Sequence, residues 1–159
     1  MKRATSSDDA FWPIEERPGL LIRRLHQIHV ALFADHCDGF DITPLQYSLL
    51  SALVLRGEAD QTTLAAAVAL DRTTTTGALM RLEARGLLKR VTSTADRRAR
   101  VCRPTRRGIE TLARMEASVR AAHEETLAPL MRAEKRQIVM LMQKLVKNHA
   151  GRNSPDKAR

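Results

Sequence analysis

The sequence holds 159 residues, with 27 lysines and arginines against 18 acidic residues, giving a formal net charge of +9 and a pI of about 10.5. A chain of this length can bury one domain core, and its charge favours a polyanionic partner, nucleic acid ahead of an anionic membrane. Aromatic residues form only 3% of the chain, which disfavours a stacking platform for single-stranded nucleic acid, and the absence of a phosphate loop, a nucleophile elbow or a diagnostic metal spacing argues against an enzyme.

The first part of the chain is predicted to be an arm followed by a long helix. Residues 1–17 form the arm, and its tryptophan, Trp12, is expected to pack across a dimer partner or over a pocket. From Leu20 to about His36, apolar residues recur at helical spacing. They are Leu21, Leu25, Ile28, Leu32 and Phe33. We therefore assign residues 18–40 to dimerisation and effector binding.

Basic side chains accompany this apolar stripe. Arg23, His26 and His29 share one side of the helix, because residues three apart are neighbours on a helix surface. One interpretation is an anion site that holds the carboxylate of a small aromatic acid. A second is zinc, bound by His26 and His29 with His36 and Cys37, although one helix cannot complete a tetrahedral site. The third is a dimer interface containing partly buried histidines and solvated arginines.

The next helix has unusually clear start and stop signals. Thr43 is the expected cap, Pro44 the first helical residue, and Gln46 completes a capping box. Gly57 ends the helix after Arg56. Four leucines should face the core, namely Leu45, Leu49, Leu50 and Leu53. Tyr47 and Ser51, with Phe33, are candidates to line a pocket against the first helix, or Tyr47 is an ordinary core residue.

Residues 60–86 are predicted to form a helix-turn-helix. Asp60 caps a short helix over Gln61 to Val68, with an apolar stripe of Leu64, Ala65, Val68 and Ala69. After a break at 69–71, a second helix is capped by Asp71 or Thr73 and ended by Gly86. Its inner face is Thr75, Leu79 and Leu82. Its outer face is Thr73, Thr74, Thr76, Gly77, Met80 and Arg81, which suits contacts with bases and phosphates.

A basic hairpin follows this helix. A strand is expected at 87–91, and a turn around Ala95 and Asp96 lies among four arginines. These are Arg97, Arg98, Arg100 and Arg103. Because four arginines would repel one another in a purely structural hairpin, a polyanion is the more economical explanation. Residues 41–104 are assigned to this DNA-binding lobe.

The C-terminal part should form two dimerisation helices over residues 105–149. Thr105 begins the first helix. Along it, residues recur at helical spacing, namely Ile109, Leu112, Met115, Glu116, Val119 and His123. Pro129 breaks it. The second helix carries a stripe of Ile138, Leu141, Met142, Leu145 and Val146. Apolar stripes with no remaining domain to cover them indicate dimerisation, and residues 150–159 are expected to be a disordered tail.

Three short stretches together resemble the signature of MarR-family transcriptional regulators, over roughly residues 20–148. They read LEARGLLKR at 82–90, DRR at 96–98 and PTRRG at 104–108. The resemblance implies a homodimer whose recognition helices enter successive major grooves and whose wing tips reach the flanking minor groove. In the family, the wing aspartate orients an arginine two residues later, which here pairs Asp96 with Arg98. The chain departs from the pattern at Thr75, usually apolar, and at Arg103-Pro104, which replaces a leucine before the threonine.

The fold expected is therefore mainly α with a small β-hairpin wing, and the function is a ligand-responsive regulator, expected to act as a repressor on an inverted repeat. The candidate DNA-binding residues are Gln61, Thr62, Arg72, Thr73, Thr74, Thr76, Met80, Arg81, Asp96, Arg97, Arg98 and Arg100. The effector candidates are Arg23, His26, His29, Phe33, Tyr47 and Ser51. Partners are double-stranded DNA, an aromatic carboxylate and a second copy, with no cofactor, metal or membrane. Alternatives are a nonspecific architectural DNA binder or a redox sensor using Cys37. With two cysteines and no signal peptide, a cytoplasmic location is predicted.

Overall fold

The computed structural model describes residues 12–93 and 98–149. In chain order the elements are the 3-10 helix η2 (Ile14–Glu16), α1 (Pro18–His36), α2 (Pro44–Arg56), α3 (Gln61–Ala67), α4 (Arg72–Ala84), β1 (Leu88–Thr92), β2 (Arg100–Pro104), α5 (Arg106–Thr126) and α6 (Arg132–His149). The prediction of a mainly helical chain with a two-stranded wing is confirmed. The hairpin turn at Ala95 and Asp96 lies outside the described residues.

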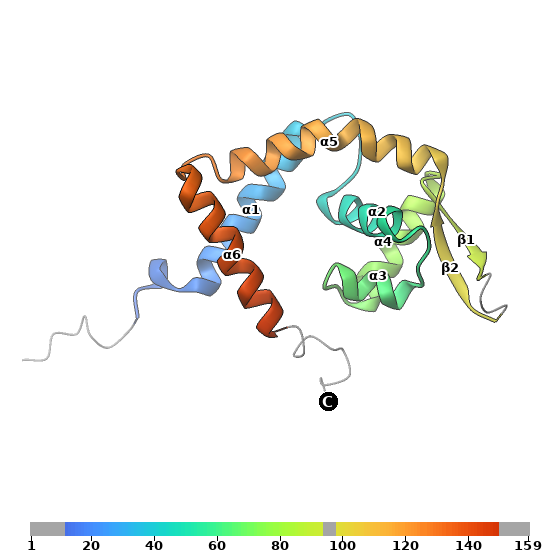
Figure 1. Cartoon of the computed structure of the whole chain (residues 1–159), viewed down its shortest axis with the longest axis horizontal. Helices are drawn as coiled ribbons and strands as arrows, with labels where there is room; N and C mark the ends of the chain where they lie inside the picture. The colour runs from blue at the N-terminus through green and yellow to red at the C-terminus, as the bar shows by residue number, and fades with distance from the viewer. Residues whose placement is uncertain (1–11, 94–97, 150–159) are drawn as a thin grey trace, which may run out of the picture.

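Helix α5 joins two groups of elements (Figure 1). Its first turns adjoin the lobe of α2, α3, α4 and the hairpin, and its later turns cross α1. Helix α6 turns back from the far end of α5 and stands apart from the lobe. Helices α1 and α6 are therefore both found at the end of the molecule away from the hairpin (Figure 1).

One continuous core lies beneath the lobe and extends along α5. Leu49, Leu50 and Leu53 of α2 are fully buried, as predicted. Leu79 and Leu82 of α4 pack in the same cluster, and so does Met115 of α5. Burying a leucine contributes on the order of 2 kcal/mol, so the inner face of α4 is firmly attached to the lobe.

The predicted helix caps of the lobe are present. The Thr43 hydroxyl accepts from the backbone N–H of Gln46, and the Gln46 side chain accepts from the N–H of Thr43, which completes the capping box. Asp60 caps α3 and Asp71 caps α4 through the N–H of Thr63 and Thr74. Each cap contributes about 1 kcal/mol and fixes the residue at which the helix begins.

Ala69 corrects the predicted apolar stripe of α3. The helix ends at Ala67, and Ala69 follows it with a φ of 54° and an exposed side chain. Its N–H bonds the carbonyl of Ala66, and the N–H of Leu70 bonds that of Ala65, which is the Schellman pattern. This left-handed residue makes the tight turn into α4, so it points away from the core.

Backbone hydrogen bonds pair the two strands of the hairpin, tie it to the lobe and join its two ends. β1 and β2 pair antiparallel with Val91 opposite Val101, and Ala59 forms an isolated bridge with Cys102. Pro104 is the last residue of β2, and the next residue, Thr105, donates its N–H to the carbonyl of Leu87. The Arg103-Pro104 departure therefore leaves a hydrogen-bonded junction between the strand and α5.

The structure shows why residue 108, the last of the PTRRG stretch, is a glycine. A Cβ at this position would overlap the carbonyl oxygen of Leu87 and touch the Leu50 side chain. The first turn of α5 can therefore lie against the start of β1 only because residue 108 has no side chain.

The apolar stripes predicted for α1 and α6 are largely uncovered in the single chain. Leu21 and Ile28 of α1 are half-exposed, and no residue of α6 is buried. Leu141 and Leu145 are 52% and 56% exposed. Within the described ranges, no helix is long and apolar enough to cross a membrane.

Candidate functional site

Asp71 organises the first turn of α4. One carboxylate oxygen accepts from the backbone N–H of Thr74 at 2.8 Å, and the other accepts from the Thr74 hydroxyl at 2.6 Å. The hydrogen bond from the Thr74 hydroxyl is the main cause that lowers the pKa of Asp71 below its ordinary value, followed by backbone N–H groups. The start of α4 is thus fixed by one charged cap on the protein surface.

The four threonines of α4 divide into one inner and three outer residues, as predicted. Thr75 is fully buried, and its hydroxyl donates to the carbonyl of Asp71 at 2.8 Å. That bond offsets the cost of burying a hydroxyl in the apolar core of the lobe. Thr73 and Thr74 are exposed and Thr76 is half-buried.

Helix α3 is linked to α4 through Gln61. Its side-chain N–H groups lie 2.5 Å from the Thr76 hydroxyl oxygen and 3.4 Å from the carbonyl oxygen of Arg72. Thr62, the next residue, is exposed. Gln61 therefore has a positioning role between the two helices that the sequence did not indicate.

The remaining candidates on α4 lie on its solvent side. Arg72 and Arg81 are exposed at the two ends of the helix, and Met80 is 56% exposed. Since Leu79 and Leu82 alternate with them and are fully buried, α4 presents one attached face and one open face. The open face is the surface expected of a helix that enters a DNA groove.

The predicted basic hairpin is supported in part. Arg98 and Arg100 are exposed, whereas Asp96 and Arg97 lie outside the described residues. Arg103 differs from the expectation of four arginines directed at a polyanion. Its guanidinium donates to the Glu58 carboxylate at 2.5 and 2.7 Å, because strand pairing brings β2 beside the end of α2.

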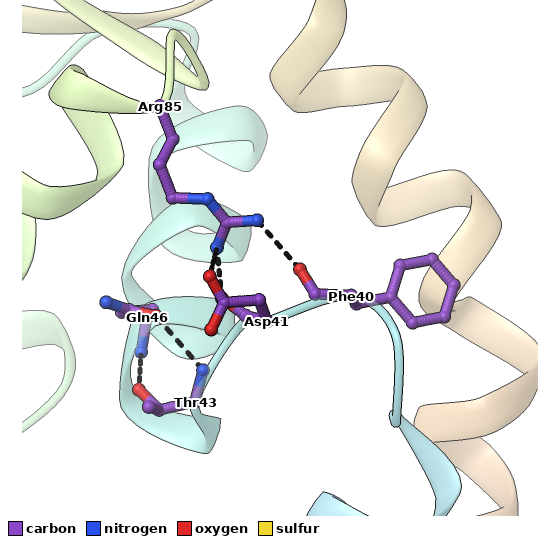
Figure 2. A network of polar contacts seen from close by, with 5 residues as sticks. All are labelled: Phe40, Asp41, Thr43, Gln46 and Arg85. Carbon is purple, nitrogen blue, oxygen red and sulfur yellow. Dashed lines mark hydrogen bonds and ion pairs between the residues drawn. The ribbon is translucent and has the colours of Figure 1, made fainter.

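Arg85, just after α4, holds the linker between α1 and α2 (Figure 2). Its guanidinium donates to the carbonyl oxygen of Phe40 at 2.8 Å and to that of Asp41, and it lies 3.7 Å from the Asp41 carboxylate. The Phe40 ring in turn lies 5.7 Å from the guanidinium carbon of Arg114 on α5. The sequence placed Arg85 only within the family signature, and this long-range contact gives it a structural role.

An open cavity of about 370 Å³ is lined mainly by α5, with one residue each from α2 and α6. It is lined by Tyr47, Glu116, Val119, Arg120, His123, Glu124, Leu127 and Lys135. The Tyr47 hydroxyl donates to Glu116 at 3.3 Å, and burial is the main cause that raises the pKa of Tyr47. The size suits a small ligand, and both apolar and cationic side chains line it.

His29 adjoins this cavity through His123. The two imidazole rings stack with centroids 4.6 Å apart, and Nδ1 of His29 lies 2.9 Å from the Thr126 hydroxyl. Because that hydroxyl donates to the carbonyl of Ala122, Nδ1 of His29 is the donor. Burial lowers the pKa of His29, and the neighbouring His123 and His26 lower it further. His29 thus links α1 to α5 in its neutral form.

The structure separates the other effector candidates. Phe33 is buried 5.9 Å from the Tyr47 ring, so it supports the cavity wall, and Ser51 is not among the lining residues. Arg23 and His26 are exposed on α1. Neither residue lines the cavity, and Arg23 lies six positions before His29, a rise of about 9 Å along the helix axis. The α5 side chains of the cavity were missed as site residues, because in sequence they only continue a helical period.

Metal and redox chemistry receive no structural support at these positions. Across residues 12–93 and 98–149, no three histidine, cysteine or acidic side chains are grouped to hold a metal. His36 instead contacts α5, where its Nε2 donates to the carboxylate of Glu125 at 2.5 Å. Cys37 is 4% exposed, and burial raises the pKa of its thiol, which disfavours the reactive thiolate.

Comparison with known proteins places these features in a family. The model of the MarR family matches residues 42–99. NicR of Pseudomonas putida, an HTH-type transcriptional repressor, is 30% identical over 139 residues, 87% of this chain and 88% of NicR. The structure of Bordetella bronchiseptica BpsR, described for regulation of its DNA binding by 6-hydroxynicotinic acid, matches with a TM-score of 0.80 and 31% identity over 85% of this chain and 96% of that one. Streptomyces coelicolor PcaV, solved with its natural ligand, matches with a TM-score of 0.78 and 32% identity over 87% and 97% of the two chains. The chain therefore belongs to the MarR family and is a DNA-binding transcriptional regulator of this type.

Proposed function

We propose that this regulator is a homodimeric repressor that binds an inverted repeat and is released from it by a small aromatic acid. The observation that carries the proposal is α4, whose inner face is fully buried while Thr73, Met80 and Arg81 on its outer face are exposed. A helix held in this way can present the same side chains to a major groove without a folding step.

The division of labour on DNA follows from charge and position. Thr73, Thr74, Thr76 and Met80 address base edges, together with Thr62 of α3, while Gln61 contributes by holding Thr76 in place. Arg72 and Arg81 contact phosphates. In the wing, Arg97 or Arg98 enters a minor groove, where narrow A·T-rich flanks concentrate negative potential, and Arg100 is a further DNA-binding candidate. Two-fold symmetry then places the half-site centres about 34 Å apart.

The second subunit is proposed from the uncovered helices. Helix α6 buries nothing in its own chain and displays Leu141, Leu145 and Val146 at helical spacing. Apolar stripes of this length on α1 and α6 are best satisfied by the same helices of a second copy.

The effector is proposed to bind in the cavity beneath α5. Val119 and Leu127 offer apolar walls for a ring, and Lys135 offers positive charge for a carboxylate, while Arg120 is paired with Glu116 at 2.9 Å. The BpsR ligand, 6-hydroxynicotinic acid, is an acid of this size. His29 would take part through His123, and Arg23 and His26 remain predicted contributors from α1. A hundredfold release from DNA would need about 2.7 kcal/mol of coupling between the two sites.

Fluorescence anisotropy tests the DNA part of the proposal. The purified chain is titrated onto labelled DNA from immediately upstream of its own coding region and onto a scrambled duplex at one moderate salt concentration. We expect at least a hundredfold preference for the first duplex. If this and other genomic fragments bind no better than scrambled DNA, the protein is a nonspecific architectural binder.

The same assay tests the effector site. Aromatic acids are added to the preformed complex, and release is compared among the wild type, Arg23→Ala, His29→Ala and Lys135→Ala. We expect all three variants to need more acid for release at unchanged DNA affinity without acid. Equal release by every variant would remove these residues from the effector site.

A further inference from the structure

We infer that α4 recognises thymine through the methyl groups of Thr74 and Thr76, and that Thr73 supplies the one threonine hydroxyl of this helix that is available to DNA. This inference rests on the proposed sequence-specific binding of DNA. It concerns which atoms of the outer face carry the specificity.

The hydroxyl protons of three threonines are already committed within the chain. Thr74 donates to the Asp71 carboxylate at 2.6 Å, and a carboxylate can only accept. Thr76 donates to the carbonyl of Arg72 at 2.7 Å, and Thr75 donates to that of Asp71. None of these hydroxyls can therefore donate to a base without breaking a bond that also holds the helix start.

Gln61 fixes the Thr76 hydroxyl a second time. Both neighbours of its side-chain nitrogen, the carbonyl of Arg72 and the Thr76 oxygen, are acceptors, so the amide group must face them with its N–H donors. The Thr76 oxygen thus both donates and accepts within the protein. Thr76 lies in a single orientation in which its methyl is the group left for a partner.

Thr73 differs from its neighbours. Its side chain is exposed, and among the residues that the structure describes its hydroxyl makes no hydrogen bond. It can donate to a phosphate or a base acceptor at no cost to α4. The outer face therefore offers one hydroxyl at Thr73 and methyl groups at Thr74 and Thr76, with Met80 one turn beyond Thr76 extending the apolar surface.

In the major groove, the thymine C5-methyl is the apolar feature that distinguishes this base, and threonine methyls are suitable partners for it. A half-site read by this face should contain thymines whose methyls contribute to binding. The oxygen and methyl of threonine can be removed separately, because serine keeps the hydroxyl and valine keeps the methyl. Valine is also β-branched, so its helix propensity matches that of threonine.

The probe is the duplex that the wild-type protein selects most strongly from a random pool of thymidine-containing DNA. Each thymidine is then replaced by deoxyuridine, which lacks only the C5-methyl, in both half-sites at once. We expect about sixteenfold weaker binding by anisotropy at one or more positions of the half-site, since each of the two lost methyl contacts weakens binding about fourfold. If deoxyuridine is tolerated at every position, the inference is wrong.

Paired variants then assign the contacts. Thr74→Val and Thr76→Val should keep the preference for thymidine over deoxyuridine, and Thr74→Ser and Thr76→Ser should each lose it at one position. Thr73 should behave in the opposite way, with serine retaining affinity and valine weakening it. If the valine variants at 74 and 76 lose the preference and the serine variants keep it, the hydroxyls are the contacting groups and the inference is overturned.

Two controls separate other causes of failure. The thermal midpoint and mass of each variant show whether it folds and assembles, and the deoxyuridine series on the wild type needs no variant at all. If the random pool yields no enriched sequence, the proposed specific regulator itself fails. An enriched sequence that is insensitive to deoxyuridine refutes only the methyl contacts.

Discussion

Ala69 and Gly86 occupy equivalent positions after two helices and are different residues. Both have a positive φ, 54° and 69°, and both helices end in the same pair of backbone hydrogen bonds. Left-handed backbone costs a residue with a Cβ about 1 kcal/mol, whereas glycine adopts it freely. We expect Ala69→Gly to raise the free energy of unfolding by a few tenths to about 1 kcal/mol, measured by urea denaturation.

Gly86→Ala is the matched control for this prediction. Nothing lies near the Cβ that it would add, so only the backbone conformation is penalised. Its free energy of unfolding should fall by about 1 kcal/mol. Equal effects of both substitutions would mean that the left-handed conformation is not what distinguishes the two sites.

His29 makes stability depend on pH. Its pKa in the folded chain lies below the ordinary value of 6.5, first because of burial and then because of His123 and His26. The unfolded chain then binds this proton more readily than the folded chain, so stability is lost as pH falls below about 6.5. His29→Gln, which cannot titrate, should have a shallower loss between pH 7 and pH 5 in thermal melts. An identical slope for both proteins would contradict the assignment.

Helix α4 is connected to more than its own lobe, since Arg85 after its last turn holds the α1–α2 linker (Figure 2). Two carbonyl oxygens depend on this guanidinium. Arg85→Ala should lower the free energy of unfolding by about 1–2 kcal/mol, because partly buried acceptors lose charge-assisted hydrogen bonds. Hydrogen exchange should also be faster at the backbone amides of residues 40–43, in the linker just before α2.

Arg106→Ala serves as the comparison for Arg85→Ala. Arg106 is 93% exposed and pairs with Glu110 four residues along the same helix. Such exposed pairs contribute little, so its stability should change by less than about 0.5 kcal/mol. If both arginines prove equally dispensable, the linker is held by the core contacts of α2 alone.

At the scale of the whole molecule, the uncovered apolar stripes of α1 and α6 predict that two chains assemble. Leu141 and Leu145 lie one turn apart on the uncovered stripe of α6. Replacing both with glutamate would place charges in the proposed subunit contact, where burying them unpaired is costly. We expect the double variant to sediment at the monomer mass of 17.8 kDa and the wild type at twice that mass.

Leu55→Glu controls for a general effect of surface charge. Leu55 is 85% exposed on α2 and does not belong to either stripe. Its mass should equal that of the wild type. A wild-type chain that is itself monomeric at micromolar concentration would reject the homodimer, and with it the spacing of two half-sites.

Local chemistry allowed the helices of the lobe to be predicted from sequence. The side chains of Thr43, Asp60 and Asp71 each accept a hydrogen bond from a backbone N–H three residues along the chain. Such caps can therefore be predicted from the local sequence. The division of α4 into inner and outer faces follows from the helical period for the same reason. Ala69 was misplaced because a left-handed alanine carries no compositional signal, unlike Gly86.

Side chains that act at long range were the ones that sequence could not assign. Arg103 looked like part of a basic tip, but strand pairing sets it against Glu58, 45 residues away. His29 was read with His26 along one helix, whereas it stacks on His123 of α5. In both cases the tertiary packing determines the partner, and residue spacing along the chain does not predict it.

By itself, then, the sequence determined the helix caps of the lobe, the winged helix-turn-helix order, the basic balance and the apolar stripes, because each depends on neighbours within one or two turns or on composition. The tertiary structure alone decided that Gln61 fixes Thr76, that Arg85 holds the α1–α2 linker and that residues of α5 line the cavity. These contacts join elements that are distant in the chain, and their geometry exists only once the shared core has set the helices at fixed distances.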